Sequence, residues 1–135
     1  MKRSNGAVLI TAYAAAGLAL PVSAHHSTAM FDHDKCVQMQ GTLRKLSMNY
    51  PHAWVWLSVT DKAGKETIWA LESTDPATLR AKGWQRSDSK PGDQMRVAVH
   101  PVRDGRAIGS VTEVRLADGR VIAGGSRSTC KLMSK

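Results

Sequence analysis

Apolar and polar side chains alternate along five short segments of the chain. In residues 53–60, Val55, Leu57 and Val59 share one face, whereas Trp54 and Trp56 share the other. The same period of two recurs in four further segments, and it predicts strands with one face buried in a core. We therefore expect strands over residues 37–44, 53–60, 66–72, 95–100 and 108–116.

Turn-forming residues separate these segments. Residues 61–64 predict a hairpin between the second and third strands, and residues 103–106 predict another between the fourth and fifth. Asn49-Tyr50-Pro51 predicts a turn before the second strand, and Lys90-Pro91-Gly92-Asp93 predicts one before the fourth. Gly41 interrupts the first strand at a place where a barrel strand would need to bend.

One helix is predicted between the third and fourth strands. Ser73-Thr74-Asp75-Pro76 supplies a capping side chain followed by proline at an early helical position. Residues 77–82 continue the helix, and Gly83 is expected to end it. A helix of barely two turns covers too little of a five-stranded sheet to bury one of its faces.

Three strands, a short helix and two more strands follow the order of the OB-fold, a small Greek-key barrel. We therefore predict an all-β, five-stranded OB-like barrel over residues 25–123, with the helix between strands three and four. Barrel closure would hide the edges that short strands expose. An open sheet packed on the helix is the alternative architecture. Residues 124–135, rich in glycine, serine and lysine, predict a flexible C-terminal tail.

The beginning of the chain predicts export. Lys2 and Arg3 precede an apolar run from Ala7 to Leu20, and the small residue Ala24 suits signal-peptidase cleavage. The run is too short to span a bilayer comfortably, since a spanning helix needs about 20 apolar residues, and a retained membrane anchor is the alternative. We therefore predict that residues 1–24 are a signal peptide. The mature chain, starting at His25, is then periplasmic and does not span the membrane.

Charge narrows the class of partner. The chain of 135 residues has room for one modest core and carries a formal net charge of +8 at pH 7. In an exported protein, positive charge attracts phospholipid, lipopolysaccharide or polysaccharide more readily than nucleic acid. Solubility alone is the other explanation of this charge. We expect a monomer that does not bind nucleic acid.

Two cysteines, Cys36 and Cys130, lie near the two ends of the mature chain. In an oxidising compartment an isolated pair usually forms a disulfide. A metal or redox site is the alternative, but the Cys-x-x-Cys spacing typical of such sites is missing. We predict a Cys36–Cys130 disulfide, which would stabilise the fold by roughly 4 kcal/mol because it closes a long loop.

Five short motifs stand out after the predicted signal peptide. They are His25-His26-Ser27, Phe31-Asp32, Asn49-Tyr50-Pro51-His52-Ala53-Trp54, Lys90-Pro91-Gly92-Asp93 and His100-Pro101-Val102-Arg103-Asp104-Gly105. As a group they resemble a family of small exported bacterial proteins classed as a domain of unknown function. The resemblance extends from His25 to about Val121. It implies a periplasmic OB-like domain, and it implies no activity and no catalytic residues.

The first candidate site is formed by two tryptophans. If Val55 and Leu57 face the core, Trp54 and Trp56 lie on the outer wall of the barrel, where OB-folds hold oligonucleotides and oligosaccharides. Indole rings stack against sugars and lipid headgroups. The alternative is that both indoles pack under residues 25–34 or on the helix.

Other residues could complete this site. We predict His52 and Arg103 as further ligand-binding residues, and Arg44 and Lys45 can also attract anions. Trp69 on the third strand can extend the aromatic surface if its side chain faces outward.

Histidines form the second candidate site. A terminal His25 would offer an amine and an imidazole to one copper ion, and His26 adds a neighbouring donor. A third ligand would come from His52 or His100, at one rim of the barrel. Copper binding is therefore the alternative function. The competing interpretation is that these histidines are solvated or hydrogen-bonded to the backbone.

Evidence for an enzyme is weak. Ser27, Asp32 and Asp34 lie near the two N-terminal histidines, but nothing in the sequence fixes the geometry of a triad. The chain also has no glycine-rich phosphate loop. We predict a non-catalytic periplasmic binding module. Its ligand would be a small molecule, an envelope glycan, a lipid headgroup or a protein.

Overall fold

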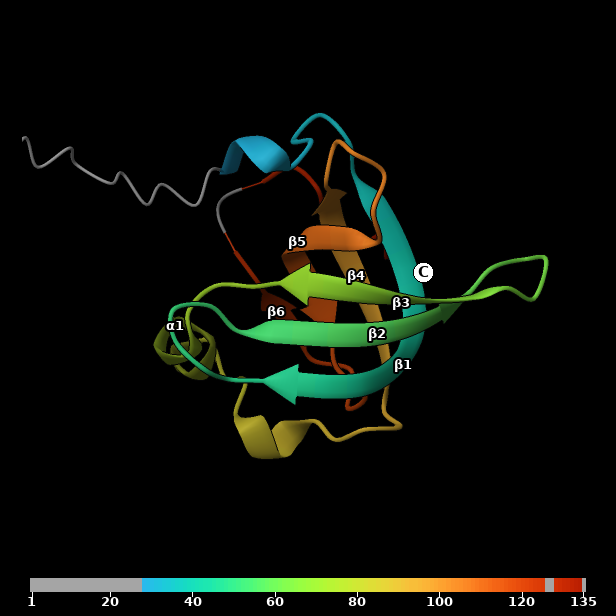
Figure 1. The fold of residues 1–135 in the computed structure, drawn as a ribbon. Helices are drawn as coiled ribbons and strands as arrows, with labels where there is room; N and C mark the ends of the chain where they lie inside the picture. The colour runs from blue at the N-terminus through green and yellow to red at the C-terminus, as the bar shows by residue number, and fades with distance from the viewer. Residues whose placement is uncertain (1–27, 126–127, 135) are drawn as a thin grey trace, which may run out of the picture.

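A computed structural model describes residues 28–125 and 128–134 (Figure 1). Within these described residues, six strands, one α-helix and two 3-10 turns follow one another. In order they are η1 (Thr28–Met30), β1 (Val37–Ser47), β2 (Trp54–Thr60), β3 (Glu66–Glu72), α1 (Pro76–Ala81), η2 (Arg86–Asp88), β4 (Gln94–Pro101), β5 (Ile108–Arg115) and β6 (Val121–Ala123).

The strands form one sheet in the order β3-β2-β1-β4-β5-β6, and a further parallel pairing of β3 with β5 closes it into a five-stranded barrel. All other pairs are antiparallel. In Figure 1, β2 and β3 lie side by side at the front, and β4 runs behind them. The closed barrel and the helix between β3 and β4 confirm the predicted OB-like fold.

The core consists of the inward-facing positions of the strands. Val55 and Leu57 are 1% and 0% exposed, as their alternation predicts. One end of the barrel is covered by α1, where Leu79 and Trp84 join the core cluster with 0% exposure each. The indole nitrogen of Trp84 donates a hydrogen bond to the Ser89 hydroxyl at 3.0 Å, so its one polar group is satisfied inside the fold.

Two local features bend β1 around the barrel. A Cβ at Gly41 would lie 2.3 Å from the carbonyl oxygen of Ser58, so only glycine permits this approach of β1 to β2. Between Leu43 and Lys45 the register shifts, because Arg44 is an extra residue in a β-bulge. After the bulge, Leu46 faces Val55 instead of continuing the odd-numbered inward pattern.

Helix α1 begins where the capping pattern predicts. The Asp75 side chain accepts a hydrogen bond from the Thr78 N–H at 2.9 Å, and Pro76 occupies the first helical position. The Thr78 hydroxyl also donates to Asp75. These bonds hold the pKa of the Asp75 carboxyl below its ordinary value. After α1, Gly83 adopts a φ of 90°, which ends the helix.

The C-terminal segment contains a strand that the alternation did not predict. Strand β6 pairs with β5, with Ile122 buried opposite Val114. Part of the predicted tail also contacts the barrel, because the Leu132 N–H donates to the Glu113 carboxylate at 2.8 Å. The flexibility of residues 124–135 stays a prediction.

Among the described residues, no helix is long and apolar enough to cross a membrane.

Candidate functional site

Trp54 and Trp56 lie on the outer wall of β2. They are half-buried, whereas Val55 and Leu57 between and beside them face the core. The two indoles stack against each other, with ring centroids 6.1 Å apart and an interplanar angle of 29°. They therefore form one continuous aromatic surface, which we call the indole wall.

Lys45 extends the indole wall onto β1. It lies opposite Trp56, and its ammonium nitrogen is 4.8 Å from the centroid of the Trp56 ring. This distance is within the range of a cation–π interaction. Lys45 faces outward because the bulge at Arg44 reverses the alternation of β1. The wall thus combines flat apolar faces with a positive charge.

Strand β3 forms the other side of the wall. Ala70 lies opposite Trp56, and Ile68 lies opposite Ser58 with 52% of its surface exposed. Trp69 is paired with Leu57, so it faces the core and packs against the core cluster. The suggestion that Trp69 extends the aromatic surface is therefore wrong. Its neighbours Ile68 and Ala70 face outward instead.

At the start of β2, the indole wall meets a contact between His52 and Glu72. His52 Nδ1 lies against the carboxylate of Glu72, and Glu72 is the register partner of Trp54. The structure thus places the predicted ligand-binding residue His52 close to the indole wall. The place of Glu72 in this site could not be predicted from the sequence, because only the register of β2 and β3 puts it beside Trp54.

An open depression of about 570 Å³ lies at the end of β1 that adjoins the indole wall. It is lined by Met48, Arg80, Gln85, Arg86 and Ser87. Met48 follows Ser47, which is opposite Trp54. An Arg80 guanidinium nitrogen also donates to the exposed Tyr50 hydroxyl at 3.4 Å, next to the cis Tyr50–Pro51 bond.

Two arginines therefore lie in this depression, close to the end of the indole wall. Their place in this site could not be predicted from the sequence, because α1 and η2 are far from β1 along the chain. Only the closed fold brings these elements together.

Arg103 has a different environment. It lies in the hairpin between β4 and β5, where its guanidinium is 3.5 Å from the Asp32 carboxylate. The backbone N–H of Arg103 donates a hydrogen bond to the Met30 carbonyl. Phe31 and Val102 form an isolated bridge beside it. The contacts of Arg103 are thus with residues 28–36, which we call the N-terminal arm. In the described part of the chain, no hydrogen bond or cation–π contact joins Arg103 to the two indoles.

Asp32 connects the arm to the barrel electrostatically. A hydrogen bond from Lys35 lowers the pKa of its carboxyl most strongly. The Asp34 N–H and the charges of Lys35 and Arg103 act in the same direction, and burial opposes them. The Lys35 ammonium is 3.2 Å from the carboxylate. Through these contacts Asp32 links the arm to the hairpin between β4 and β5.

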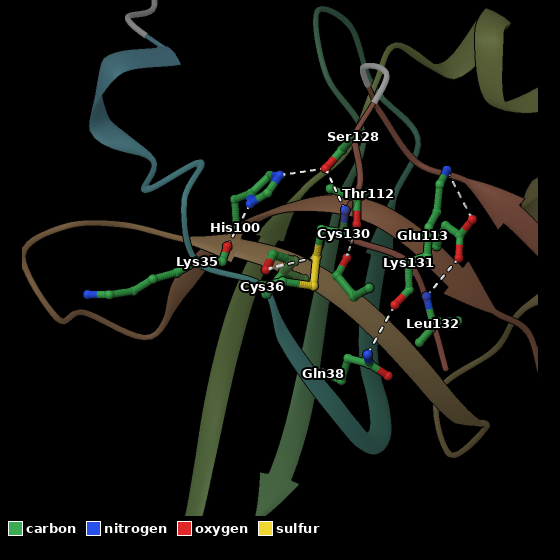
Figure 2. The surroundings of a disulfide bond; sticks show 12 residues. Lys35, Cys36, Gln38, His100, Thr112, Glu113, Ser128, Cys130, Lys131 and Leu132 are labelled. Atoms are coloured by element: carbon green, nitrogen blue, oxygen red, sulfur yellow. Dashed lines mark hydrogen bonds and ion pairs between the residues drawn. A yellow bond between two sulfur atoms is a disulfide. The ribbon is translucent and has the colours of Figure 1, made fainter. Parts of the chain in front are cut away.

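His100 is buried and hydrogen-bonded through both ring nitrogens (Figure 2). Nδ1 lies 2.7 Å from the Lys35 carbonyl, which can only accept, so Nδ1 carries a proton. In the neutral ring, Nε2 then accepts a hydrogen bond from the Ser128 hydroxyl at 2.8 Å. The Ser128 oxygen in turn accepts the Cys130 N–H at 3.0 Å. His100 thus joins the N-terminal arm to the C-terminal segment.

The disulfide lies beside this network. Cys36 and Cys130 are bonded, with their Cα atoms 5.3 Å apart and 94 positions apart in sequence, as predicted (Figure 2). Cys130 is buried, and further contacts hold its neighbours: Gln38 donates to the Lys131 carbonyl and accepts the Met133 N–H. Both ends of the described chain are therefore fixed to β1 and β4.

This arrangement of the described histidines does not support the alternative function, copper binding. His25 and His26 lie outside the described residues, so their role stays a prediction. His52 is paired with Glu72, and both nitrogens of His100 are used. Within residues 28–125 and 128–134, no group of three or more His, Cys, Asp or Glu side chains could hold a metal ion.

Comparison with known proteins places the chain in a family. No curated protein matches the sequence significantly. A family match, in contrast, extends over residues 14–112, which is well over half of the chain and includes the indole wall. The chain therefore belongs to the family of unknown function DUF6152.

Proposed function

We propose that this protein is an exported, non-catalytic binding module whose ligand lies on the indole wall. The observation that carries the proposal is the stacked pair Trp54 and Trp56, half-exposed outside a barrel whose core Val55 and Leu57 already fill. Keeping two large aromatic rings at the surface forgoes the stabilisation that full burial gives, which favours a role in recognition.

A glycan of the cell envelope is the ligand class that fits this surface best. Pyranose rings present flat apolar faces that stack on indoles. The Glu72 carboxylate and the Lys45 ammonium can bond to hydroxyl groups beside the rings. Arg80 and Arg86 in the adjoining depression favour a glycan with acidic groups. The front of β2 and β3 is also where OB-folds bind oligosaccharides.

The polar groups of the barrel support a non-catalytic role. The Ser128–His100 pair has the residue types of a nucleophile and a base, but the Lys35 carbonyl stands where a hydrolase triad has a carboxylate. The Ser128 oxygen also accepts the Cys130 N–H. These bonds favour a structural role, fixing the C-terminal segment.

We propose that the protein is exported and is located in the periplasm. A disulfide joining Cys36 to Cys130 suits an oxidising compartment. Lys2, Arg3 and the apolar run from Ala7 to Leu20 have the pattern of a signal peptide. N-terminal sequencing of the purified protein tests this, and we expect His25 as the first residue.

The binding proposal is tested with a double variant. Trp54→Ala with Trp56→Ala should abolish binding of envelope oligosaccharides, measured by isothermal titration calorimetry with a panel of neutral and acidic ones, while the far-UV circular dichroism spectrum stays unchanged. Lys62→Ala, an exposed change in the turn that follows β2, is the matched control and should keep binding. Binding that survives in the double variant would overturn the proposal, as would the absence of binding to every oligosaccharide in the wild type.

A further inference from the structure

A row of three polar side chains crosses the opposite wall of the barrel. Gln40 on β1 is the register partner of Arg96 on β4, and Arg96 is the partner of Arg115 on β5. Both arginines face outward, since their neighbours Val97 and Val114 are fully buried. The two arginine side chains therefore leave the barrel from directly opposed positions on adjacent strands.

Two positive charges placed opposite each other destabilise a sheet unless an anion lies between them. No carboxylate of the described residues forms an ion pair with Arg96 or Arg115. Glu113, on the same face of β5, bonds to Lys131 at 3.2 Å and to the Leu132 N–H. Asp118, in the following turn, pairs with Arg120 at 2.7 Å. The acidic groups nearby in sequence are thus used elsewhere.

A second observation concerns the Nε atom of Arg115. Among the described residues, it is the one buried side-chain nitrogen or oxygen without a hydrogen-bond partner. An unsatisfied buried donor costs free energy, and a missing ion or water is a common reason for it. Nε and one terminal nitrogen of a guanidinium form a fork that matches two oxygens of an oxyanion. The described residues thus leave one donor of the Arg115 guanidinium without an acceptor.

The three side chains also line a hollow. A depression of about 240 Å³ is formed by Gln40, Arg96 and Arg115 together with Gln94 and Gly119. Gln94 donates its amide to Thr42 at 2.7 Å, whereas Gln40 is exposed and can donate to a ligand. The hollow therefore offers two guanidinium groups and one amide to a small anion.

We propose that this hollow is a phosphate-binding site. A phosphate monoester carries a charge of about −1.5 to −2 at pH 7, which balances two guanidinium groups, and its oxygens can accept from several donors at once. A carboxylate balances only one of the two. The site lies on β4 and β5, away from the indole wall on β2 and β3, and it does not depend on the glycan proposal.

Arginine side-chain NMR tests the site in the intact mature protein. Titration with inorganic phosphate at constant ionic strength should shift the Nε–H signal of Arg115 and leave the indole N–H signals of Trp54 and Trp56 in place. Arg96→Gln should weaken phosphate binding about tenfold or more, since it removes one of two charge-assisted partners. Arg44→Gln, the same change on an exposed β1 residue, should not weaken it.

Vesicles distinguish a free phosphate from a lipid headgroup. Phosphatidic acid in phosphatidylcholine vesicles should retain the protein in flotation, and Arg96→Gln should release it, if the phosphate belongs to a lipid. Flotation that is unchanged by Arg96→Gln, together with a phosphate-dependent Arg115 shift, would assign the site to soluble phosphates. An Arg115 signal that phosphate does not move, or an equal loss of affinity in Arg44→Gln, would overturn the proposal.

Discussion

The Lys45 ammonium lies 4.8 Å from the Trp56 ring because a bulge at Arg44 turns Lys45 to the outside of β1. Without that extra residue, the alternation set by Leu43 would direct residue 45 into the core. A single irregularity in one strand thus positions the positive charge of the indole wall.

The first prediction concerns this pair. Lys45→Met should change the tryptophan emission spectrum and lower the free energy of unfolding by about 0.5–1 kcal/mol, the range of an exposed cation–π contact. Arg44→Met, which removes a neighbouring exposed cation, should leave the spectrum unchanged. Emission spectra and urea unfolding measure both effects, and an identical response of the two variants would show that the contact contributes nothing.

The second prediction separates the tryptophans by role. Trp84→Ala should lower the free energy of unfolding by about 3–5 kcal/mol, because it leaves a cavity where the fully buried indole fills the end of the barrel. Trp54→Ala should cost clearly less, since that ring is half-exposed. Chemical denaturation of both variants gives the comparison. Equal losses would mean that Trp54 is part of the core.

The alternation of apolar residues was enough to predict the barrel, since each of the five long strands buries one face and the Asp75-Pro76 pair begins α1. It did not predict β6, which has three residues and one buried side chain, Ile122. Nor did it predict that Trp84 enters the core, because the residue follows the glycine that ends the helix and belongs to no periodic pattern.

In the candidate sites, too, some residues could be predicted from the sequence and others could not. Trp54 and Trp56 could be placed on the outer wall from their own strand, because a period of two fixes the face. Glu72, Lys45 and the Arg96–Arg115 pair depend on the register between strands and on a bulge. Neither the register between strands nor the position of the bulge can be predicted from a single sequence. Arg103 was grouped with the indoles, whereas its contacts are with Asp32 and Met30.

The third prediction tests the close approach of β1 to β2. Gly41→Ala should destabilise the fold by about 1–3 kcal/mol, since the added methyl group meets the Ser58 carbonyl and the Leu57 side chain. Gln40→Ala, at the preceding exposed position, should change stability little. Thermal unfolding distinguishes the two. A neutral Gly41→Ala would mean that β1 can shift away from β2 without loss.

The fourth prediction is a loss of stability in acid. Hydrogen bonds and charges lower the pKa of Asp32, Asp75 and Asp93 in the folded state, with Lys35, Thr78 and Lys90 as the main partners. A carboxyl whose pKa is lower in the folded chain stabilises the fold at pH values above the pKa that the same carboxyl has in the unfolded chain, which is near 3.8. This stabilisation disappears as the pH falls below that value. Urea unfolding between pH 7 and pH 2.5 should therefore show a steep decline at the acid end.

Two variants identify the contribution of Asp32. Asp32→Asn should make that acid decline shallower, because the neutral amide no longer gains a proton. Lys35→Gln should have a similar effect, since it removes the strongest cause of the lowered pKa. An unchanged slope in both variants would show that the arm contributes nothing to acid unfolding.

The fifth prediction concerns the disulfide. Cys36→Ser with Cys130→Ser should lower the free energy of unfolding by about 4 kcal/mol in the chain-entropy account, because the bond closes a loop of about a hundred residues. Denaturation with and without a reducing agent checks this, and the double variant should not respond to the reducing agent. A wild type equally stable after complete reduction would contradict it.

The position of the disulfide affects how the folded protein responds to proteolysis. The covalent ring from Cys36 to Cys130 encloses all six strands, from Val37 to Ala123. Exposed turns such as 61–65 and 103–106 are the usual points of proteolytic nicking. A single cut there opens the ring but releases no fragment. The nicked barrel therefore remains one molecule, and its strands can stay paired.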